Sequence, residues 1–285
     1  MRVKGVILIT LALFLGLGGL ILHLLAIFTT KWKITKRDKD PPLAPISYGL
    51  WQRCEMQNVT FSKQAVGINA RETYVCMPNR YLRYNSEHNA ECFYRRRECG
   101  LYSANSIPAD CRCRYLPSTK GLQWLTILAA ISLVLGLLLL YLKLIATAQN
   151  GSAAFLLGFA PFIFIFLAFL FILTTLILFG SYLRRDSYEE FQFPLNTLKN
   201  LDDSTNQNRL GFNLHGLKNY IRRHPELFDR EKARATIDEL LTTINDTYHT
   251  VIGWSAGFEI IALILVLGST VLAFLLAMGS KSEDV

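Results

Sequence analysis

The sequence predicts an all-α membrane protein, built as a left-handed, up-down bundle of four helices. Its apolar residues gather into four blocks, and each reaches the length of about 20 residues at which a helix spans a bilayer. In lipid each block must be helical, because only a helix satisfies its backbone hydrogen bonds within one segment. All six cysteines lie in the long segment between the first and second blocks, which indicates a loop outside the cytosol.

The four blocks also set the expected organisation of the chain. The spans are expected at residues 6–28, 121–145, 153–183 and 252–277. They are flanked by an N-terminus (1–5), a first loop (29–120), a short link (146–152), a helical second loop (184–251) and a tail (278–285). The first block exceeds the roughly 7–15 apolar residues of a signal peptide, and no small-residue cleavage site follows it. We therefore expect it to be an uncleaved span.

The net charge of +8 and the pI of about 9.2 raise the question of a nucleic-acid partner. The basic excess is concentrated in the first loop, where 16 Lys and Arg residues stand against 8 Asp and Glu residues between Phe28 and Lys120. The same loop holds every cysteine and a glycosylation sequon. Nucleic acid is therefore not expected as a partner, whereas the lipid bilayer is.

Cysteines and sequons predict the orientation. An even number of cysteines confined to one loop indicates disulfides in an oxidising compartment. Asn58 and Asn245 open Asn-x-Thr glycosylation sequons, one in each long loop. Asn150 also opens a sequon, but it lies in the short link and is expected to stay unmodified. Both long loops are thus expected outside the plasma membrane, with both termini cytosolic.

Two ionisable residues interrupt the spans, His23 in the first and Glu259 in the fourth. An ionisable group inside a span is a functional hypothesis by default. The first and fourth spans are neighbours in an up-down bundle, so a direct His23–Glu259 contact is one interpretation. The other is a protonated Glu259 bonded to a backbone carbonyl. Gly16, Gly18 and Gly19 either permit close helix packing or reflect the glycine content of membrane helices.

The second loop is expected to contain two helices. Leu217, Tyr220 and Ile221 indicate a short helix that ends near His224-Pro225. A second helix is expected from Pro225 onward, because proline suits a first helical turn. Its apolar stripe consists of residues at helical spacing: Ile237, Leu240, Leu241, Ile244, Tyr248 and Val251. We expect this helix to continue into the fourth span and to pack its stripe against the first loop.

No catalytic constellation is visible in the sequence. Nucleophile-elbow, zinc-protease, Walker and dinucleotide motifs do not occur, and Cys111-Arg112-Cys113 lacks a second cysteine pair at zinc spacing. We expect neither an enzyme nor a cofactor nor a metal site. The last three residues, Glu283-Asp284-Val285, match a less common class of PDZ-binding terminus, so a PDZ scaffold is a candidate partner beside the alternative of an unspecific tail.

Six residues of the first loop resemble a known signature: Trp32, Gly49, Leu50, Trp51, Cys54 and Cys76. A Trp after the first span, then Gly-Leu-Trp-x-x-Cys and a second Cys, is similar to the claudin superfamily. That superfamily includes peripheral-myelin and epithelial membrane proteins and the calcium-channel γ subunits. The resemblance implies a small antiparallel β-sheet formed by the first loop, with Trp51 at the outer rim of the bundle.

The resemblance also implies a disulfide between Cys54 and Cys76, with Cys113 as an alternative partner for Cys54. An insert at residues 83–114, which departs from the family pattern, contains the other four cysteines, and we expect them to pair within it. These four are Cys92, Cys99, Cys111 and Cys113. The second loop is also far longer than that of a claudin.

Two functions follow from the resemblance. One is a claudin-like protein of cell–cell junctions, whose loops contact other membrane proteins, including copies of itself, in the same membrane and in the facing membrane. The other is an auxiliary subunit of an ion channel or receptor, favoured by the large loops and by Gly253-Trp254-Ser255. Five arginines of the insert either form an anion-favouring surface or a solvated turn: Arg95, Arg96, Arg97, Arg112 and Arg114.

Overall fold

The structure is a computed structural model that describes residues 2–37, 45–59, 71–84, 99, 111–148, 158–191, 193–194, 198–199 and 211–279. The chain divides into two compact units. The bundle unit comprises Met1–Trp32, Pro117–Ser181 and Ile252–Val285. The loop unit comprises Lys33–Leu116 and Tyr182–Val251.

Four long helices make up the bundle unit. They are α1 (Arg2–Phe28), α3 (Pro117–Ala148), α5 (Ala160–Ser181) and α9 (Trp254–Gly279). Each is long and apolar enough to cross a membrane, which confirms the prediction of four such helices. Large apolar side chains such as Phe14, Ile131 and Ile264 are exposed on them, as on surfaces that face lipid. These features indicate a multi-pass membrane protein.

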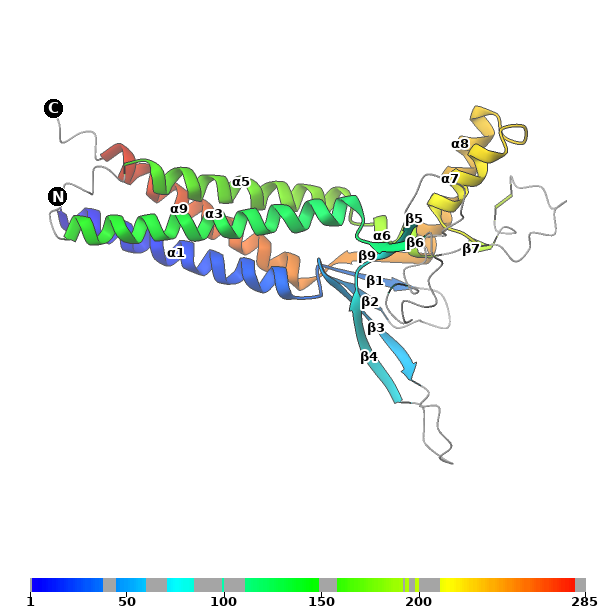
Figure 1. Cartoon of the computed structure of the whole chain (residues 1–285), viewed down its shortest axis with the longest axis horizontal. Coiled ribbons are helices and arrows are strands. Elements are labelled where there is room, and N and C mark those ends of the chain that lie inside the picture. The colour runs from blue at the N-terminus through cyan, green and yellow to red at the C-terminus, as the bar shows by residue number, and fades with distance from the viewer. Residues whose placement is uncertain are drawn as a thin grey trace. The chain divides into compact units, whose positions relative to one another are not determined.

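The helices pack in a closed ring. α1 contacts α3 and α9, and α5 contacts α3 and α9. The start of α1 and the end of α9 lie at the same end of the bundle (Figure 1). Ile9, Leu133, Ile165 and Val266 are among the aliphatic residues of the bundle core.

Close helix contacts occur at two of the glycines in α1. A Cβ atom on Gly16 would overlap Leu137 Cδ2 of α3, and one on Gly19 would lie 2.8 Å from Val266 Cγ2 of α9. Both approaches are closer than a carbon–carbon contact allows. Of the two interpretations of these glycines, close helix packing is therefore the one that the structure supports.

The third span was predicted to begin at residue 153. The structure shows a turn at Gly158, whose φ is 28°, and α5 begins at Ala160. Pro161 lies in the first turn of α5, where its missing N–H is not needed. Residues 153–157 lie outside the described part of the chain.

The loop unit contains the predicted small antiparallel sheet. Its strands are β1 (Lys33–Arg37), β2 (Ile46–Tyr48), β3 (Gln52–Val59), β4 (Arg71–Pro78) and β9 (Tyr248–Ile252), in the order β4-β3-β2-β1-β9. Two-stranded pairs are formed by β5 (Tyr81–Tyr84) with β6 (Cys111–Arg114), and by β7 (Phe193–Pro194) with β8 (Gly211–Phe212). The five-stranded sheet thus combines four strands of the first loop with one of the second.

The predicted continuous helix into the fourth span is wrong. The short helix α7 (Leu214–Arg223) is present, but α8 (Arg230–Thr247) begins after Pro225, with Asp229 as its N-cap, and β9 separates it from α9. Tyr248 and Val251 fit the helical spacing of the stripe. However, Thr250, Val251 and Ile252 are three consecutive β-branched residues, which favour a strand.

The apolar stripe of α8 does not pack where we expected it. Leu240 and Ile244 belong to a buried cluster with Phe193, Leu198 and Leu217, all of them residues of the second loop. Ile237 and Tyr248 pack against the same cluster. Among the described residues, the second loop therefore has an apolar core of its own, and the prediction that its stripe covers the first loop is wrong.

Candidate functional site

The Gly49-Leu50-Trp51 sequence forms the tight connection between β2 and β3. The Gly49 N–H donates to the Gln52 carbonyl at 2.7 Å, which closes the turn. Asn79, which follows β4, holds the turn from outside. Its Nδ2 donates to Gly49 O at 3.0 Å, and its backbone N–H donates to Trp51 O at 2.9 Å. Leu50 is buried, and the motif fixes the corner of the sheet between β2 and β3.

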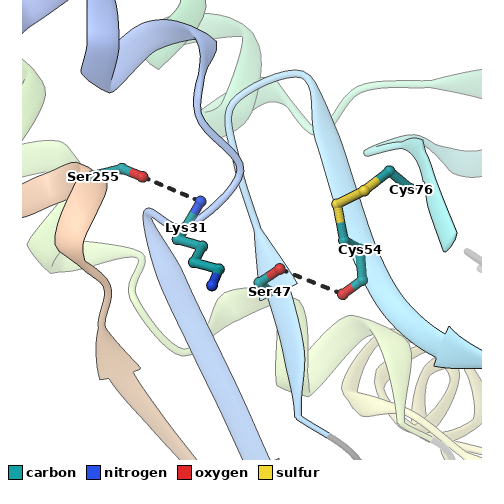
Figure 2. Close-up of a disulfide and its surroundings, with 5 residues drawn as sticks. All are labelled: Lys31, Ser47, Cys54, Cys76 and Ser255. Carbon is teal, nitrogen blue, oxygen red and sulfur yellow. Dashed lines mark hydrogen bonds between the residues drawn. A yellow bond between two sulfur atoms is a disulfide. The ribbon is translucent and has the colours of Figure 1, made fainter. Parts of the chain in front are cut away.

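A disulfide joins Cys54 of β3 to Cys76 of β4 directly behind this turn (Figure 2). The two residues are opposite each other in the strand register, with their Cα atoms 4.0 Å apart, so the bridge links neighbouring strands. Cys113 pairs with Cys99 instead, which excludes the alternative Cys54–Cys113 pairing. Cys92 lies outside the described residues, and Cys111 is on β6.

Arg53, inside the signature, is fully buried and pairs with the second loop. Its guanidinium Nη1 donates to Glu190 Oε1, and Nη2 contacts the Met77 sulfur at 2.7 Å. The other oxygen of the Glu190 carboxylate accepts a hydrogen bond from the Tyr48 hydroxyl. A buried carboxylate with both oxygens bonded is stable only while its cation is present.

A second ion pair has the same design. Lys33 Nζ of β1 pairs with the Asp186 carboxylate, which also accepts a hydrogen bond from the buried Tyr81 hydroxyl. Asp186 and Glu190 are four residues apart on α6 (Arg185–Glu190), so their side chains leave the same face of that helix. The ion pairs and the two tyrosine hydroxyls thereby attach α6 to four strands of the first loop: β1, β2, β3 and β5.

Hydroxyl groups add a third attachment within the loop unit. Thr250 Oγ1 of β9 lies 3.0 Å from Thr35 Oγ1 of β1 and 3.0 Å from Ser187 Oγ of α6. The first and second loops thus share a sheet, two ion pairs that are largely shielded from solvent, and the hydroxyl contact between Thr35 and Thr250. They form one folded body rather than two separate loops.

In the bundle unit, Trp32 is buried where the chain leaves α1. Its indole N–H donates to Ala26 O at 2.6 Å, and its ring meets Phe179 of α5 edge-on with 5.2 Å between ring centroids. Its backbone carbonyl accepts a hydrogen bond from Gly253 N at 2.8 Å. This signature residue joins the ends of α1, α5 and α9.

Gly253 and Ser255 fasten the start of α9 to the same segment. Ser255 Oγ accepts hydrogen bonds from Lys31 N at 3.1 Å (Figure 2) and from Thr29 Oγ1 at 2.7 Å. A Cβ on Gly253 would overlap Lys31 O, so only glycine fits. Gly253 and Ser255 of the Gly253-Trp254-Ser255 sequence therefore have contacts inside the bundle unit.

His23 and Glu259 are in direct contact inside the bundle, and neither is exposed. His23 Nδ1 lies 2.8 Å from both carboxylate oxygens, and Nε2 lies 3.0 Å from Thr126 O of α3. A carbonyl only accepts, so Nε2 carries a hydrogen. Nδ1 and the carboxylate then share one further proton, and the pair has zero net charge wherever that proton resides. Of the two interpretations, the structure supports the direct contact.

The other predicted site residues are dispersed. Asn58 is on β3, and the Asn245 side chain on α8 accepts hydrogen bonds from Arg184 Nη1 at 2.9 Å and from the Tyr188 hydroxyl at 3.3 Å. Arg112 and Arg114 are exposed on β6. The remaining predicted residues, Arg95, Arg96, Arg97, Glu283, Asp284 and Val285, lie outside the described residues. Glycosylation, the arginine surface and the PDZ-binding end stay predictions.

Sequence reasoning missed the charged residues that join the loops. Arg53 stands within the signature itself, and the spacing of Asp186 and Glu190 is typical of one helix face. The position of Arg53 and the spacing of Asp186 and Glu190 can both be read from the sequence. Neither shows that these side chains are buried or that they pair with one another. Asn79 and Thr126 had no signal in the sequence, because their roles depend on partners far away along the chain.

The sequence matches no protein-family model and no curated protein. Within the described residues, no group of three or more His, Cys, Asp or Glu side chains is placed to hold a metal ion. Membership of the claudin superfamily is accordingly a proposal, which rests on the signature residues and on the arrangement of spans and loops.

Proposed function

We propose that the chain is a divergent member of the claudin superfamily that acts at cell–cell contacts of the plasma membrane through its extracellular loops. The observation that carries this proposal is the Gly49-Leu50-Trp51 turn backed by the Cys54–Cys76 disulfide. The turn belongs to a sheet that follows the first of four apolar helices. In this proposal both long loops lie outside the cell and both termini are cytosolic.

The loop unit is suited to binding because its parts are fixed before a partner arrives. The pairs Arg53–Glu190 and Lys33–Asp186 hold α6 against strands of the first loop. A surface that is already ordered loses less conformational entropy on binding. Such a body supports contacts with copies in the same membrane and with a facing membrane.

The test uses cells that form no junctions of their own. Tagged protein is expressed in half of a mixed culture, and its fluorescence at cell borders is measured. We expect enrichment where two expressing cells meet and none where an expressing cell meets a non-expressing one. Cys54→Ser with Cys76→Ser should abolish the enrichment at equal surface abundance. The matched control is Gln52→Ala, which changes an exposed residue of the same strand. Uniform membrane staining at all borders contradicts the proposal.

An auxiliary subunit of a channel or receptor is the second candidate function. The second loop favours it, because the hairpin of α7 and α8 folds around an apolar cluster of its own, which includes Leu217, Leu240 and Ile244. A body that is folded on its own can bind a partner without support from the first loop. Cross-linking on intact cells followed by mass spectrometry separates the two functions, because this candidate predicts that the cross-linked partner is a channel rather than another copy of the chain.

If the protein forms a paracellular path, its first loop should disfavour cations. Arg112 and Arg114 are exposed on β6, and like charge in a narrow path repels cations. Dilution potentials across a transfected cell layer measure this selectivity. We expect Arg112→Gln with Arg114→Gln to lower the chloride-to-sodium permeability ratio. An unchanged ratio removes these two arginines from the path.

A further inference from the structure

Side chains from two helices of the bundle unit and a backbone carbonyl from a third meet in a buried polar junction. Its members are His23 of α1, Glu259 of α9 and the Thr126 carbonyl of α3, so each comes from a different helix. His23, Glu259 and Thr126 all have zero exposure. The Thr126 hydroxyl donates within its own helix, to Gln123 O at 2.9 Å, and therefore does not compete for the imidazole.

We propose that this junction is a register lock, which selects one packing arrangement of α1, α3 and α9 among several of similar apolar contact. Apolar packing selects weakly between arrangements in a membrane, because lipid tails are as apolar as leucine. The junction selects strongly, because both ring nitrogens of His23 and both oxygens of Glu259 have partners only in the observed register.

The geometry of a helix shows why neighbouring registers fail. A shift of one residue along α1 rotates the side chain by about 100° and moves it by about 1.5 Å. His23 would then leave the carboxylate and the Thr126 carbonyl together. Glu259 would be buried without a base, and such a group is strongly destabilising. A single polar contact that fixes helix register is the best-attested role of buried polar pairs.

The remaining contacts between α1 and α9 do not depend on this pair. Ser269 Oγ donates to Ala12 O at 2.9 Å, and Gly19 packs against Val266. A bundle without the pair should therefore still assemble, but in more than one register. This inference concerns the bundle unit alone and stands whether or not the proposed role at cell contacts is correct.

The first measurement is a double-mutant cycle on thermal unfolding of the purified, detergent-solubilised protein. His23→Leu leaves Glu259 without its base and should lower Tm by about 10 °C. His23→Leu with Glu259→Leu should regain at least half of that loss. Glu259→Gln keeps a donor for Nδ1 and should stay within a few degrees of wild type. Thr175→Val is the matched control, because Thr175 is buried but its hydroxyl bonds only within its own helix, to Phe171 O.

The second measurement reads register directly, by cysteine cross-linking in native membranes. Ala12→Cys with Ser269→Cys should cross-link efficiently in an otherwise wild-type chain, whereas Leu13→Cys with Ser269→Cys should not. In the double-leucine background, the first yield should fall at least threefold and the second should rise. A double-leucine Tm as low as that of His23→Leu overturns the coupling of the pair. Cross-linking that stays confined to positions 12 and 269 in that background overturns the register lock.

Discussion

The bundle unit and the loop unit bury ionisable groups in different ways. In the bundle, His23 and Glu259 share a proton, and the His23 ring also donates a hydrogen bond to a backbone carbonyl. In the loop unit, Asp186 and Glu190 each pair with a basic side chain and a tyrosine hydroxyl. The bundle helices satisfy their own backbone hydrogen bonds, so a few polar contacts between helices are enough beside their apolar packing. A short strand cannot satisfy its backbone hydrogen bonds by itself. The loop unit is therefore also stabilised by ion pairs and disulfides.

Because of this difference, we expect a substitution in one unit to unfold that unit while the other stays folded. Substitutions in the loop unit should release the sheet while the four long helices stay in the membrane. Substitutions at the helix ends should change the bundle first. Four variants test this separation, with effects that are expected to decrease from the first to the last.

Arg53→Met should have the largest effect. It leaves the Glu190 carboxylate buried without a cation, at a cost of about 3–5 kcal/mol in the free energy of unfolding of the loop unit. The expected readout is rapid proteolysis of the loops on intact cells, with the helices still membrane-embedded. Arg53→Met combined with Glu190→Leu should recover most of the protection. If the single variant resists protease like wild type, Arg53 does not hold the loops together.

Replacing the central disulfide should have the next largest effect. Cys54→Ser with Cys76→Ser opens a bridge that spans 22 residues of sequence, which corresponds to about 3 kcal/mol of lost chain-entropy stabilisation. Thermal unfolding should show an earlier transition of the loop unit and an unchanged bundle transition. A shift of both transitions by the same amount means that the two units unfold as one.

Gly253→Ala tests the bundle side of the comparison. The new Cβ would overlap the backbone oxygen of Lys31, so the start of α9 must move. The expected loss is about 2–3 kcal/mol in the stability of the bundle unit. Gly257→Ala is the matched control, because no other side chain or neighbouring helix lies within 4 Å of the position that its Cβ would occupy. Equal Tm values for both variants contradict the close approach.

Asp229→Ala should have the smallest and most local effect. The Asp229 side chain caps α8 by accepting a hydrogen bond from Lys232 N at 2.7 Å. Its loss should cost about 1 kcal/mol. Hydrogen exchange should accelerate in the first turn of α8 and nowhere in the four long helices. Faster exchange at the far end of α8 as well would mean that the helix unfolds as a whole.

Hydropathy and the spacing of apolar residues predicted the elements whose structure depends on residues that are near in sequence. The four apolar helices follow from hydropathy, and the helix α7 follows from Leu217, Tyr220 and Ile221. The strand β9 escaped prediction because Tyr248 and Val251 also fit a helix period, although the β-branched run 250–252 and the pairing with β1 favour a strand.

Some contacts of the candidate site could also be predicted from the sequence, and others could not. Cys54 and Cys76 could be paired by resemblance, and a His23–Glu259 contact could be proposed from the neighbouring spans. The third member of that junction, Thr126 O, is a backbone atom and leaves no trace in the sequence. Arg53 and Glu190 are 137 positions apart, so no local pattern could join them.

The most direct test of the proposed function is the side of the membrane on which the cysteine-rich loop lies. Every cysteine of the chain falls between Cys54 and Cys113, so one labelling experiment reports on that loop alone. Intact cells are treated with a membrane-impermeant maleimide before and after an impermeant reductant. We predict strong labelling of intact cells only after reduction. Labelling that requires permeabilised cells, or that is complete without reduction, would contradict an extracellular, disulfide-bonded loop.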